Sequence, residues 1–305
     1  MSVLVVGSVA YDSVKTPFGE VDKALGGSAT FFSAAASFLT DTQLVAVVGE
    51  DFDISDLDFL RERGVDLSGL DVVAGETFRW KGHYGYDLNE AKTLSTELNV
   101  FETFDPKLSE KQRKAEFVFL ANILPELQLS VLDQVESPKF TVVDTMNLWI
   151  DTKAVELGEV LSRVDMVVIN ESEARQLAGE ANTFRAIERI REMGPKFVVV
   201  KRGEYGALLS AHGNHFFAPA FPLESVFDPT GAGDTFGGGL VGTIARNGRF
   251  DEATLRQGVV VGSVLASFAV EKFSLDRMRT LKWSEVVARY QKMQALTRFD
   301  TLTIE

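Results

Sequence analysis

Residues 228–239 read DPTGAGDTFGGG, a run with too few side chains to fill a hydrophobic core. The sequence from Thr235 to Asn247 predicts a helix, so GAG at 231–233 lies directly before its first turn. Free N–H groups and the positive end of the helix dipole bind anions at such a position. The simpler alternative is a glycine-rich turn with Asp234 as the helix N-cap.

The rest of the chain alternates short apolar runs with amphipathic stretches. The runs are typical of buried parallel strands, and they occupy residues 3–7, 44–49, 117–122, 140–145, 166–170 and 197–203. Helices are predicted between several of them, at residues 29–39, 172–181 and 186–194. This alternation predicts an α/β fold in which helices cover both faces of a central, mostly parallel sheet.

Two stretches interrupt this pattern. Residues 13–25 and 77–101 combine alternating, β-prone residues with turn glycines. They predict strands outside the main sheet, in a small β lid within residues 11–25 and 77–101. No internal repeat or clear linker is recognisable in the sequence, so a single α/β domain over residues 1–305 is expected.

The composition limits the classes of function. A net charge of −13 and a pI of about 4.8 disfavour binding of nucleic acid or an anionic membrane by the bulk surface. The chain has no cysteine, which excludes disulfides, thiolate nucleophiles and cysteine-ligated metals. The opening MSVLVVGSVAYD lacks the basic region of a signal peptide, and the apolar stretch 259–270 is too short to span a membrane. A cytoplasmic location is therefore expected.

Two common nucleotide-binding motifs do not occur in the sequence. There is no GxxxxGK[ST], which excludes a Walker A loop. The first predicted strand is followed by GSVAYD, which lacks the GxGxxG of a dinucleotide-binding fold. A dinucleotide-dependent oxidoreductase is therefore disfavoured, and the anion site at 231–233 belongs to another class.

Four segments together indicate that class. GAGD at 231–234 resembles the C-terminal signature of the ribokinase-like (PfkB) family of sugar and nucleoside kinases. GGSA at 26–29, NESE at 170–173 and VVVKRGEYGALL at 198–209 agree with the family in order and spacing. The resemblance spans almost the whole chain. It implies a ribokinase-like α/β fold with a small β lid, and an ATP-dependent, magnesium-requiring kinase that phosphorylates a hydroxyl of a small-molecule sugar or nucleoside.

The resemblance assigns catalysis to the GAGD loop. Family members use its aspartate as general base on the acceptor hydroxyl, and the corresponding residue here is Asp234. The amides of Gly231, Ala232 and Gly233 would stabilise the charge that develops on the transferred phosphoryl group. A carboxylate at a helix start and the free amides beside it point to the same spot, so the chemistry fits this assignment.

Other motif positions are expected to bind the nucleotide and its metal. Asn170 and Glu173 match the family's NxxE, which orders Mg²⁺ and the nucleotide phosphates, with Glu173 binding the metal through water. Lys201 would reach a phosphate of ATP, and Gly203 and Gly206 would allow close approach of the backbone. Without the resemblance, NESE is an acidic helix start and Lys201 is a solvated strand end.

The N-terminal positions are expected to hold the acceptor. Asp12 would accept hydrogen bonds from two vicinal hydroxyls, and Gly26, Gly27 and Ser28 match the neighbouring substrate positions of the family. Arg79, in the predicted lid, is a further candidate for contact with the acceptor. Its alternative role is simple packing within the lid.

The resemblance also bears on potassium and on assembly. Asp228 and Thr230 match positions that ligate K⁺ in relatives that use potassium. An Asx-turn at Asp228 is an equal alternative. The later ligand positions are not recognisable in VEKFSLDRM at 270–278, so dependence on potassium stays open. A homodimer formed through the lid is implied by the resemblance alone.

Two departures from the family affect the expected specificity. GGSATFF places Phe31 where relatives usually carry an asparagine, so one polar contact to a sugar is absent. VDTMNLW at 143–149 keeps Asp144 and Asn147 but lacks the arginine that relatives often have. The acceptor therefore stays open among sugars, sugar phosphates, sugar acids and nucleosides. The alternative function is a catalytically silent sensor of a sugar or nucleotide with the same fold.

Overall fold

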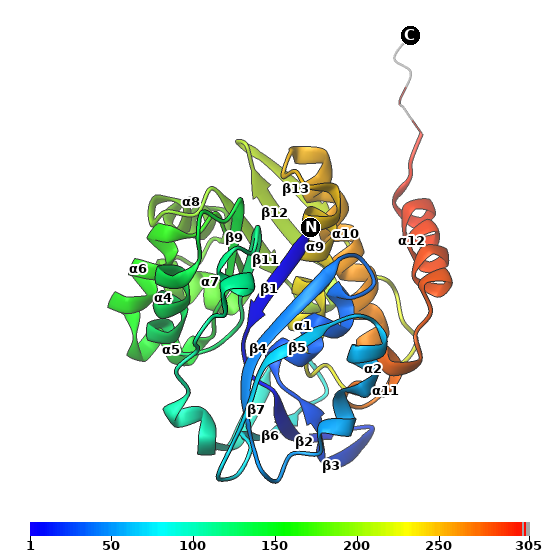
Figure 1. Ribbon diagram of the computed structural model, residues 1–305. Coiled ribbons are helices and arrows are strands. Elements are labelled where there is room, and N and C mark those ends of the chain that lie inside the picture. The colour runs from blue at the N-terminus through cyan, green and yellow to red at the C-terminus, as the bar shows by residue number, and fades with distance from the viewer. Residues whose placement is uncertain (301, 303–305) are drawn as a thin grey trace.

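Figure 1 shows the computed structural model, which describes residues 1–300 and 302. Within these residues the main sheet has nine strands in the order β13-β12-β11-β10-β9-β8-β1-β4-β5. Pairing is parallel from β11 to β5, and β12 and β13 add an antiparallel hairpin at one edge. The strands are β1 Ser2–Val6, β4 Asp41–Gly49, β5 Asp66–Val73, β8 Phe117–Leu120, β9 Phe140–Asp144, β10 Met166–Asn170, β11 Phe197–Lys201, β12 Ala207–Ala211 and β13 Asn214–Ala218.

Strand β1 explains why the central strands are continuous apolar runs. Val3 and Val5 belong to one hydrophobic core, and Leu4 and Val6 belong to a second core on the other face of the sheet. Successive side chains alternate between the two faces of a strand, so a sheet covered on both sides has no polar face. All six predicted strands are confirmed, and β5, β12 and β13 extend the sheet beyond the prediction.

Helices cover both faces of this sheet (Figure 1), which confirms the predicted fold class. One core is closed by α1, α2 and α9 to α12, and the other by α4 to α8. The helices are α1 Ser28–Ala36, α2 Asp58–Glu62, α3 Glu110–Arg113, α4 Pro125–Gln134, α5 Asn147–Thr152, α6 Ala154–Arg163, α7 Glu171–Ala178, α8 Thr183–Glu192, α9 Ala232–Asn247, α10 Glu252–Ala269, α11 Asp276–Thr280 and α12 Trp283–Thr297.

A second, four-stranded sheet lies below the carboxyl ends of the central strands in Figure 1. Its order is β3-β2-β6-β7, with β2 and β6 parallel and the two outer pairs antiparallel. We call this sheet the lid. The hydroxyl of Thr16 in β2 donates to the carbonyl of Phe227 at 2.9 Å, which ties the lid to the loop before α9. The lid strands are β2 Ala10–Thr16, β3 Gly19–Gly26, β6 Arg79–Tyr84 and β7 Ala91–Glu97.

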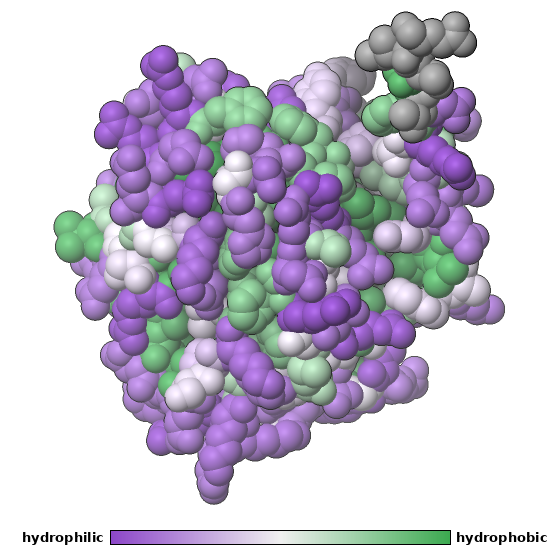
Figure 2. All heavy atoms as spheres, turned by 90° about the horizontal axis from the view of Figure 1, so that it is seen from above, coloured by the Kyte–Doolittle hydropathy of each residue, from purple (hydrophilic) through white to green (hydrophobic). Residues whose placement is uncertain are grey.

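The edge of the molecule opposite the lid is shown in Figure 2, where hydrophilic side chains cover most of the periphery. Exposed hydrophobic side chains appear between them and do not dominate this face. Over residues 1–300 and 302, the structure contains no helix with the length and apolar character required to cross a membrane.

Helix α9 begins at Ala232 rather than at the predicted Thr235. Gly231 is its N-cap with φ 72°, so Asp234 lies inside the first turn and the N-cap alternative for it is wrong. A left-handed backbone is accessible to glycine without the usual steric penalty. A Cβ at Gly231 would also lie 2.3 Å from the ring of Phe31 in α1.

Glycines in the middle of α9 let neighbouring helices approach it closely. A Cβ on Gly238 would lie 2.3 Å from the carbonyl oxygen of Phe32 in α1. A Cβ on Gly239 would lie 2.8 Å from the Cα of Gly262 in α10. Glycine lowers helix stability, so close packing explains its presence here. These contacts fix where the first turn of α9 can lie.

A pair of glycine substitutions tests this packing. Gly238→Ala should lower the free energy of unfolding by about 1–3 kcal/mol, because the backbone of α1 must move to admit the methyl group. Gly158→Ala in α6 is the matched control, since a Cβ there meets no atom within 4 Å. The control should raise the free energy of unfolding by about 0.4–1 kcal/mol. Urea denaturation measures both, and equal stability of the two variants would contradict the packing argument.

Candidate active site

The polar residues of the predicted site lie where parallel strands end. Asp144 is the last residue of β9, Asn170 of β10 and Lys201 of β11. The register pairs Asn170 with Lys201, so these two ends are adjacent. The carboxyl ends of parallel strands share one edge of a sheet, where α/β proteins bind their ligands. Residues that are far apart in the sequence are brought together at this edge.

Lys201 lies at the centre of this group. Its Nζ donates to Asp144 Oδ2 at 2.9 Å and is 3.0 Å from where a Cβ on Gly233 would lie. Burial lowers the pKa of Lys201, but Asp144, Glu173 and Asp234 raise it above its ordinary value. The ammonium group therefore stays charged and balances three acidic groups around it.

Asp234 occupies the first turn of α9 and faces this lysine. Its pKa is raised to about 7, first by burial and then by the nearby Asp144, whereas Lys201 opposes the shift. A carboxyl group with a pKa near 7 accepts a proton far more readily than an ordinary aspartate. Asp234 is thus poised to act as a base at neutral pH.

The NESE segment forms a reciprocal capping box at the start of α7. The side chain of Asn170 accepts from the Glu173 N–H at 2.8 Å, and Glu173 Oε2 accepts from the Asn170 N–H at 2.9 Å. Burial raises the pKa of Glu173 to about 7, and Lys201 opposes that shift. Both predicted residues therefore lie beside Lys201, and the local helix start accounts for one carboxylate oxygen of Glu173.

The amides predicted to form an anion site are not equivalent. The Ala232 N–H donates to the carbonyl of Pro229 at 3.2 Å, so that amide is already engaged within the loop. Among the described residues, the N–H groups of Gly231 and Gly233 have no hydrogen-bond acceptor. Free amides at the N-terminus of a long helix bind anionic oxygens. Of the three predicted amides, only those of Gly231 and Gly233 are therefore available to an anion.

Asp12 lies on the other side of the loop, at the start of the lid. Its carboxylate packs against Gly26, where a Cβ would lie 2.0 Å from an oxygen of Asp12, and it accepts from the Gly27 N–H. Burial raises the pKa of Asp12 to about 7, and the nearby Asp228 and Asp234 add to the shift. Gly26 and Gly27 thus allow this carboxyl group to be held close to the backbone.

Ser28 lies next to this group but has partners of its own. Its Oγ accepts from the Ser8 N–H at 3.2 Å, and its N–H donates to Ser8 Oγ at 3.0 Å. The two hydroxyls are 3.1 Å apart. Ser28 therefore links the turn after β1 to α1 and positions the GGSA segment. The buried Asp12 remains as the acceptor of hydrogen bonds here.

Asp228 is almost completely buried and shapes the loop before α9. Its Oδ1 accepts from the Thr230 N–H at 2.9 Å, and its Oδ2 accepts from the Ser274 N–H at 3.0 Å. These bonds fit the Asx-turn alternative. Within the part of the chain that the structure describes, no group of three or more His, Asp or Glu could hold a metal ion.

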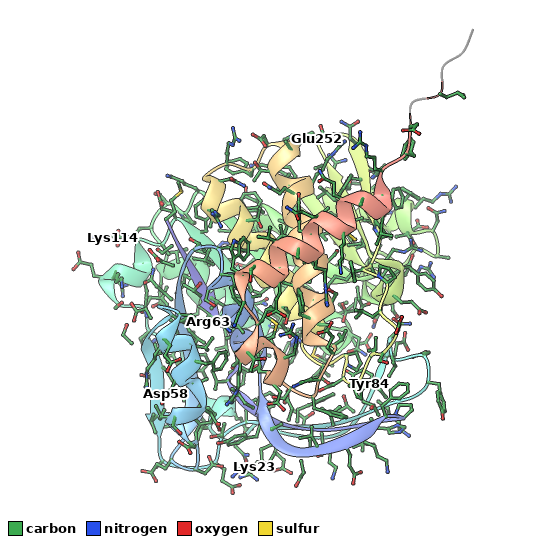
Figure 3. All side chains as sticks on the ribbon, turned by 90° about the vertical axis from the view of Figure 1, so that its right-hand side faces the viewer. Lys23, Asp58, Arg63, Tyr84, Lys114 and Glu252 are labelled. Atoms are coloured by element: carbon green, nitrogen blue, oxygen red, sulfur yellow. The ribbon has the colours of Figure 1, made fainter. Side chains whose placement is uncertain are left out.

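Sequence reasoning missed Tyr84, the last residue of β6, which Figure 3 shows in the lid. Its hydroxyl is 3.4 Å from Thr230 Oγ1. Burial raises the pKa of Tyr84 well above its ordinary value, and Asp228, Asp12 and Asp234 add to the shift while the Thr230 hydroxyl opposes it. No sequence motif marks Tyr84, because its position depends on how the lid folds over the sheet.

Arg79, the predicted lid contact, is paired within the protein. Its Nη2 donates to Asp51 Oδ2 at 2.8 Å and lies 3.4 Å from Glu76 Oε1. Asp51 also accepts from the N–H and hydroxyl of Thr77, at 2.7 and 2.6 Å. These bonds join β6 to the loop after β4, so the lid-packing alternative describes what Arg79 does in the structure.

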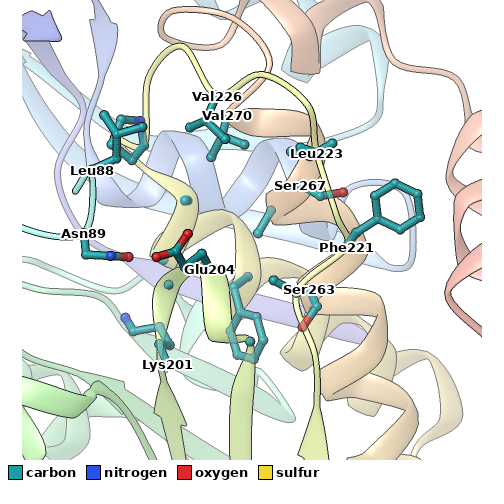
Figure 4. A pocket seen from close by; sticks show the side chains of 18 of the residues that line it. Leu88, Asn89, Lys201, Glu204, Phe221, Leu223, Val226, Ser263, Ser267 and Val270 are labelled. Atoms are coloured by element: carbon teal, nitrogen blue, oxygen red, sulfur yellow. The ribbon is translucent and has the colours of Figure 1, made fainter. Parts of the chain in front are cut away.

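A cavity of about 500 Å³ extends from Lys201 along the first turns of α9 and the C-terminal half of α10. Gly203, Gly206 and Gly233 line the end near Lys201, and Figure 4 shows Phe221 and Ser267 on the opposite wall. A cavity of this size with a mostly apolar wall and a cation at one end suits a nucleotide. Three of the predicted nucleotide-binding residues, Lys201, Gly203 and Gly206, thus line one cavity, whereas Asn170 lies outside its lining.

Arg289 of α12 supports the far wall of this cavity. Its Nη1 donates to Ser267 Oγ at 3.0 Å, and its guanidinium lies 4.9 Å from the ring centre of Phe221 and 3.5 Å from that of Phe268. A carboxylate oxygen of Glu271 accepts from the same guanidinium. Arg289 therefore holds two cavity-lining residues in place through a partly buried network.

Similarity to known proteins agrees with this geometry. Relatives named as cytidine kinase and ribose-1-phosphate kinase define the class, a phosphotransferase with an alcohol group as acceptor. Residues 2–280 match the pfkB family of carbohydrate kinases. The chain belongs to this family, as its GAGD, NxxE and GGSA segments predicted.

Three relatives illustrate the match. Cytidine kinase of Thermococcus kodakarensis is 29% identical over 267 residues, which are 85% of this chain and 94% of that protein. Nucleoside kinase of Methanocaldococcus jannaschii has a TM-score of 0.76 at 20% identity, over 95% of this chain and 98% of that one. An E. coli protein described as ribokinase II, in complex with ATP and Mg²⁺, has a TM-score of 0.77 at 19% identity, over 95% and 99% of the two chains. The structural matches show a shared fold, and kinases of this family use ATP with Mg²⁺.

Proposed function

We propose that this chain transfers the γ-phosphoryl group of ATP to a hydroxyl of a neutral sugar or nucleoside. Asp234 acts as general base, and the Gly231–Gly233 loop binds the charge on the transferred group. The observation that carries the proposal is the position of Asp234, in the first turn of α9 with a pKa of about 7 and Lys201 close by. The silent-sensor alternative has no support in the named relatives, which are kinases.

The acceptor hydroxyl loses its proton to the carboxylate of Asp234. Proton transfer is efficient when the pKa of the base is near the working pH, and the buried Asp234 meets this condition. The N–H groups of Gly231 and Gly233 are fixed by helix α9, so they stabilise developing negative charge without having to reorganise. The hydrogen bond between Ala232 and Pro229 holds this loop in shape.

Lys201, Asn170 and Glu173 would hold the nucleotide and its metal. When bound, ATP with Mg²⁺ supplies the phosphoryl group and neutralises part of its charge. Glu173 fits a magnesium site reached through water, because the capping box occupies only its Oε2. Lys201 supports a phosphate at the end of the cavity lined by Gly203 and Gly206.

A neutral acceptor is favoured by the charges around Asp12. The pKa of Asp12 is raised first by burial and then by Asp228 and Asp234, and no basic side chain of the described residues lowers it. Arg79 is already paired with Asp51. A phosphate or carboxylate on the acceptor would be repelled by these acids, whereas hydroxyl groups can donate to Asp12. Similarity to a cytidine kinase over 94% of its length supports a nucleoside as first candidate.

An acceptor panel tests this proposal directly. ADP release with Mg²⁺ should be fastest with cytidine, another nucleoside or a neutral sugar, and slow with sugar phosphates and sugar acids. The rate should be the same in Na⁺ and K⁺, because Asp228 already accepts from two backbone amides. A sugar phosphate or sugar acid as best substrate would contradict the charge argument. Nucleotide binding without turnover of any acceptor would favour the sensor.

Substitution of the base gives a second prediction. Asp234→Asn should lower kcat by about 10²–10⁴-fold, because the hydroxyl loses its proton acceptor, while ATP still binds. Asp133→Asn in α4 is the matched control, since Asp133 is an exposed aspartate paired with Arg163. Steady-state kinetics should show the control within twofold of the wild type. Retention of most activity in Asp234→Asn would refute the assignment of the base.

The raised pKa of Asp234 predicts the pH dependence. Only the ionised carboxylate accepts a proton, so kcat/KM should fall about tenfold per pH unit as the pH drops below about 7. Asp144 raises the pKa of Asp234, so Asp144→Asn should move this acid limb to lower pH. Profiles of kcat/KM between pH 5 and pH 9 (roughly two units on either side of neutrality) measure both effects. An acid limb unchanged by Asp144→Asn would contradict the electrostatic coupling.

A further inference from the structure

The hairpin loop between β6 and β7 reaches the nucleotide cavity. We propose that its tip, residues 86–89, is part of the nucleotide site, and that Asn89 donates to a phosphate oxygen of the bound nucleotide. This inference rests on the proposed function. It goes further because it makes one lid hairpin a partner of both substrates.

The tip forms one wall of the cavity. Tyr86, Asp87, Leu88 and Asn89 line it together with Lys201 and Gly233. Figure 4 shows Leu88 and Asn89 across the cavity from Phe221 and Ser267. The lid therefore encloses the nucleotide cavity as well as the side of the site that contains Asp12.

Asn89 lies at the phosphate end of this cavity. A Cβ on Gly203 would be 1.9 Å from Asn89 Oδ1, so the lid tip touches the backbone two residues after Lys201. Among the described residues, the Asn89 side chain has no hydrogen-bond partner. Its NH₂ group is thus available to donate to an anionic oxygen held by Lys201.

The tip has a defined backbone conformation. The Leu88 N–H donates to the Gly85 carbonyl at 3.2 Å, and the Asn89 N–H donates to Asp87 Oδ1 at 2.9 Å. Leu88 has φ 54°, a left-handed conformation that is uncommon for a residue with a branched side chain. This turn places the partly buried Leu88 at the cavity and leaves the side-chain amide of Asn89 without a hydrogen-bond partner among the described residues, beside Gly203. Backbone strain of this kind is concentrated at sites that close on ligands.

The same hairpin contacts the acceptor side of the site. Tyr84 is the last residue of β6, and its hydroxyl faces Thr230 at 3.4 Å with Asp12 and Asp234 nearby. Only Gly85 separates Tyr84 from the tip. A nucleotide that fixes the tip therefore also fixes Tyr84 over the acceptor, and the coupling between the two ligands is reciprocal.

Binding measurements on two variants test the inference. Isothermal titration with AMP-PNP and Mg²⁺ should show Kd raised about tenfold by Asn89→Ala, because a hydrogen bond to a charged group is lost. Asn89→Asp keeps the size of the side chain and adds a negative charge, so its Kd should rise at least as much. Ser95→Ala, an exposed position in β7 outside the cavity, should bind like the wild type. An unchanged Kd in both Asn89 variants would overturn the inference.

Protection of the hairpin gives an independent readout. Tyr86 is 88% exposed, so chymotrypsin should cleave after it in the free enzyme. AMP-PNP with Mg²⁺ should slow this cleavage without any acceptor. Cleavage that responds to the acceptor alone would refute a role of the tip in nucleotide binding while leaving the kinase proposal intact. Failure of the wild type to bind AMP-PNP at all would instead contradict the proposed function.

Discussion

The site depends on one constraint. Helix α9 packs against α1 and α10 through glycines, with no side chains between the backbones. Gly238 touches the backbone of α1, and Gly239 touches Gly262 of α10. Protein interiors are close-packed, so these contacts leave little freedom in how far α9 can slide along its axis. The axial position of α9 in turn sets where Gly231, Gly233 and Asp234 meet the strand ends. Close packing of α9 in the core therefore fixes the positions of the residues in its first turn.

Charge balance is the second condition that the fold satisfies. Lys201 is surrounded by Asp144, Glu173 and Asp234, and burial holds the last two near a pKa of 7. Removing charged groups from water is unfavourable unless they are paired. The acids around Lys201 are therefore only partly compensated. In the proposed function, this excess of negative charge favours a metal ion beside Glu173 and uptake of a proton by Asp234.

Much of this arrangement could be predicted from the sequence, because motifs at strand ends and helix starts depend on local backbone geometry. The six central strands, the helix after GAG and the NESE cap belong to this group. The predicted start of α9 at Thr235 is too late, because Gly233 and Asp234 have low helix propensity and concealed the first turn. Tyr84 and the tip at 86–89 could not be found, because their roles depend on how the lid folds over the sheet. The Arg79–Asp51 pair is likewise a product of tertiary structure.

The C-terminal helix α12 supports the cavity beside Lys201 from outside the region that matches the family. The family match ends at residue 280, yet Arg289 of α12 holds Ser267 and Phe221 on the cavity wall. Substitutions in α12 can therefore reshape this wall of the cavity while every recognisable motif stays intact.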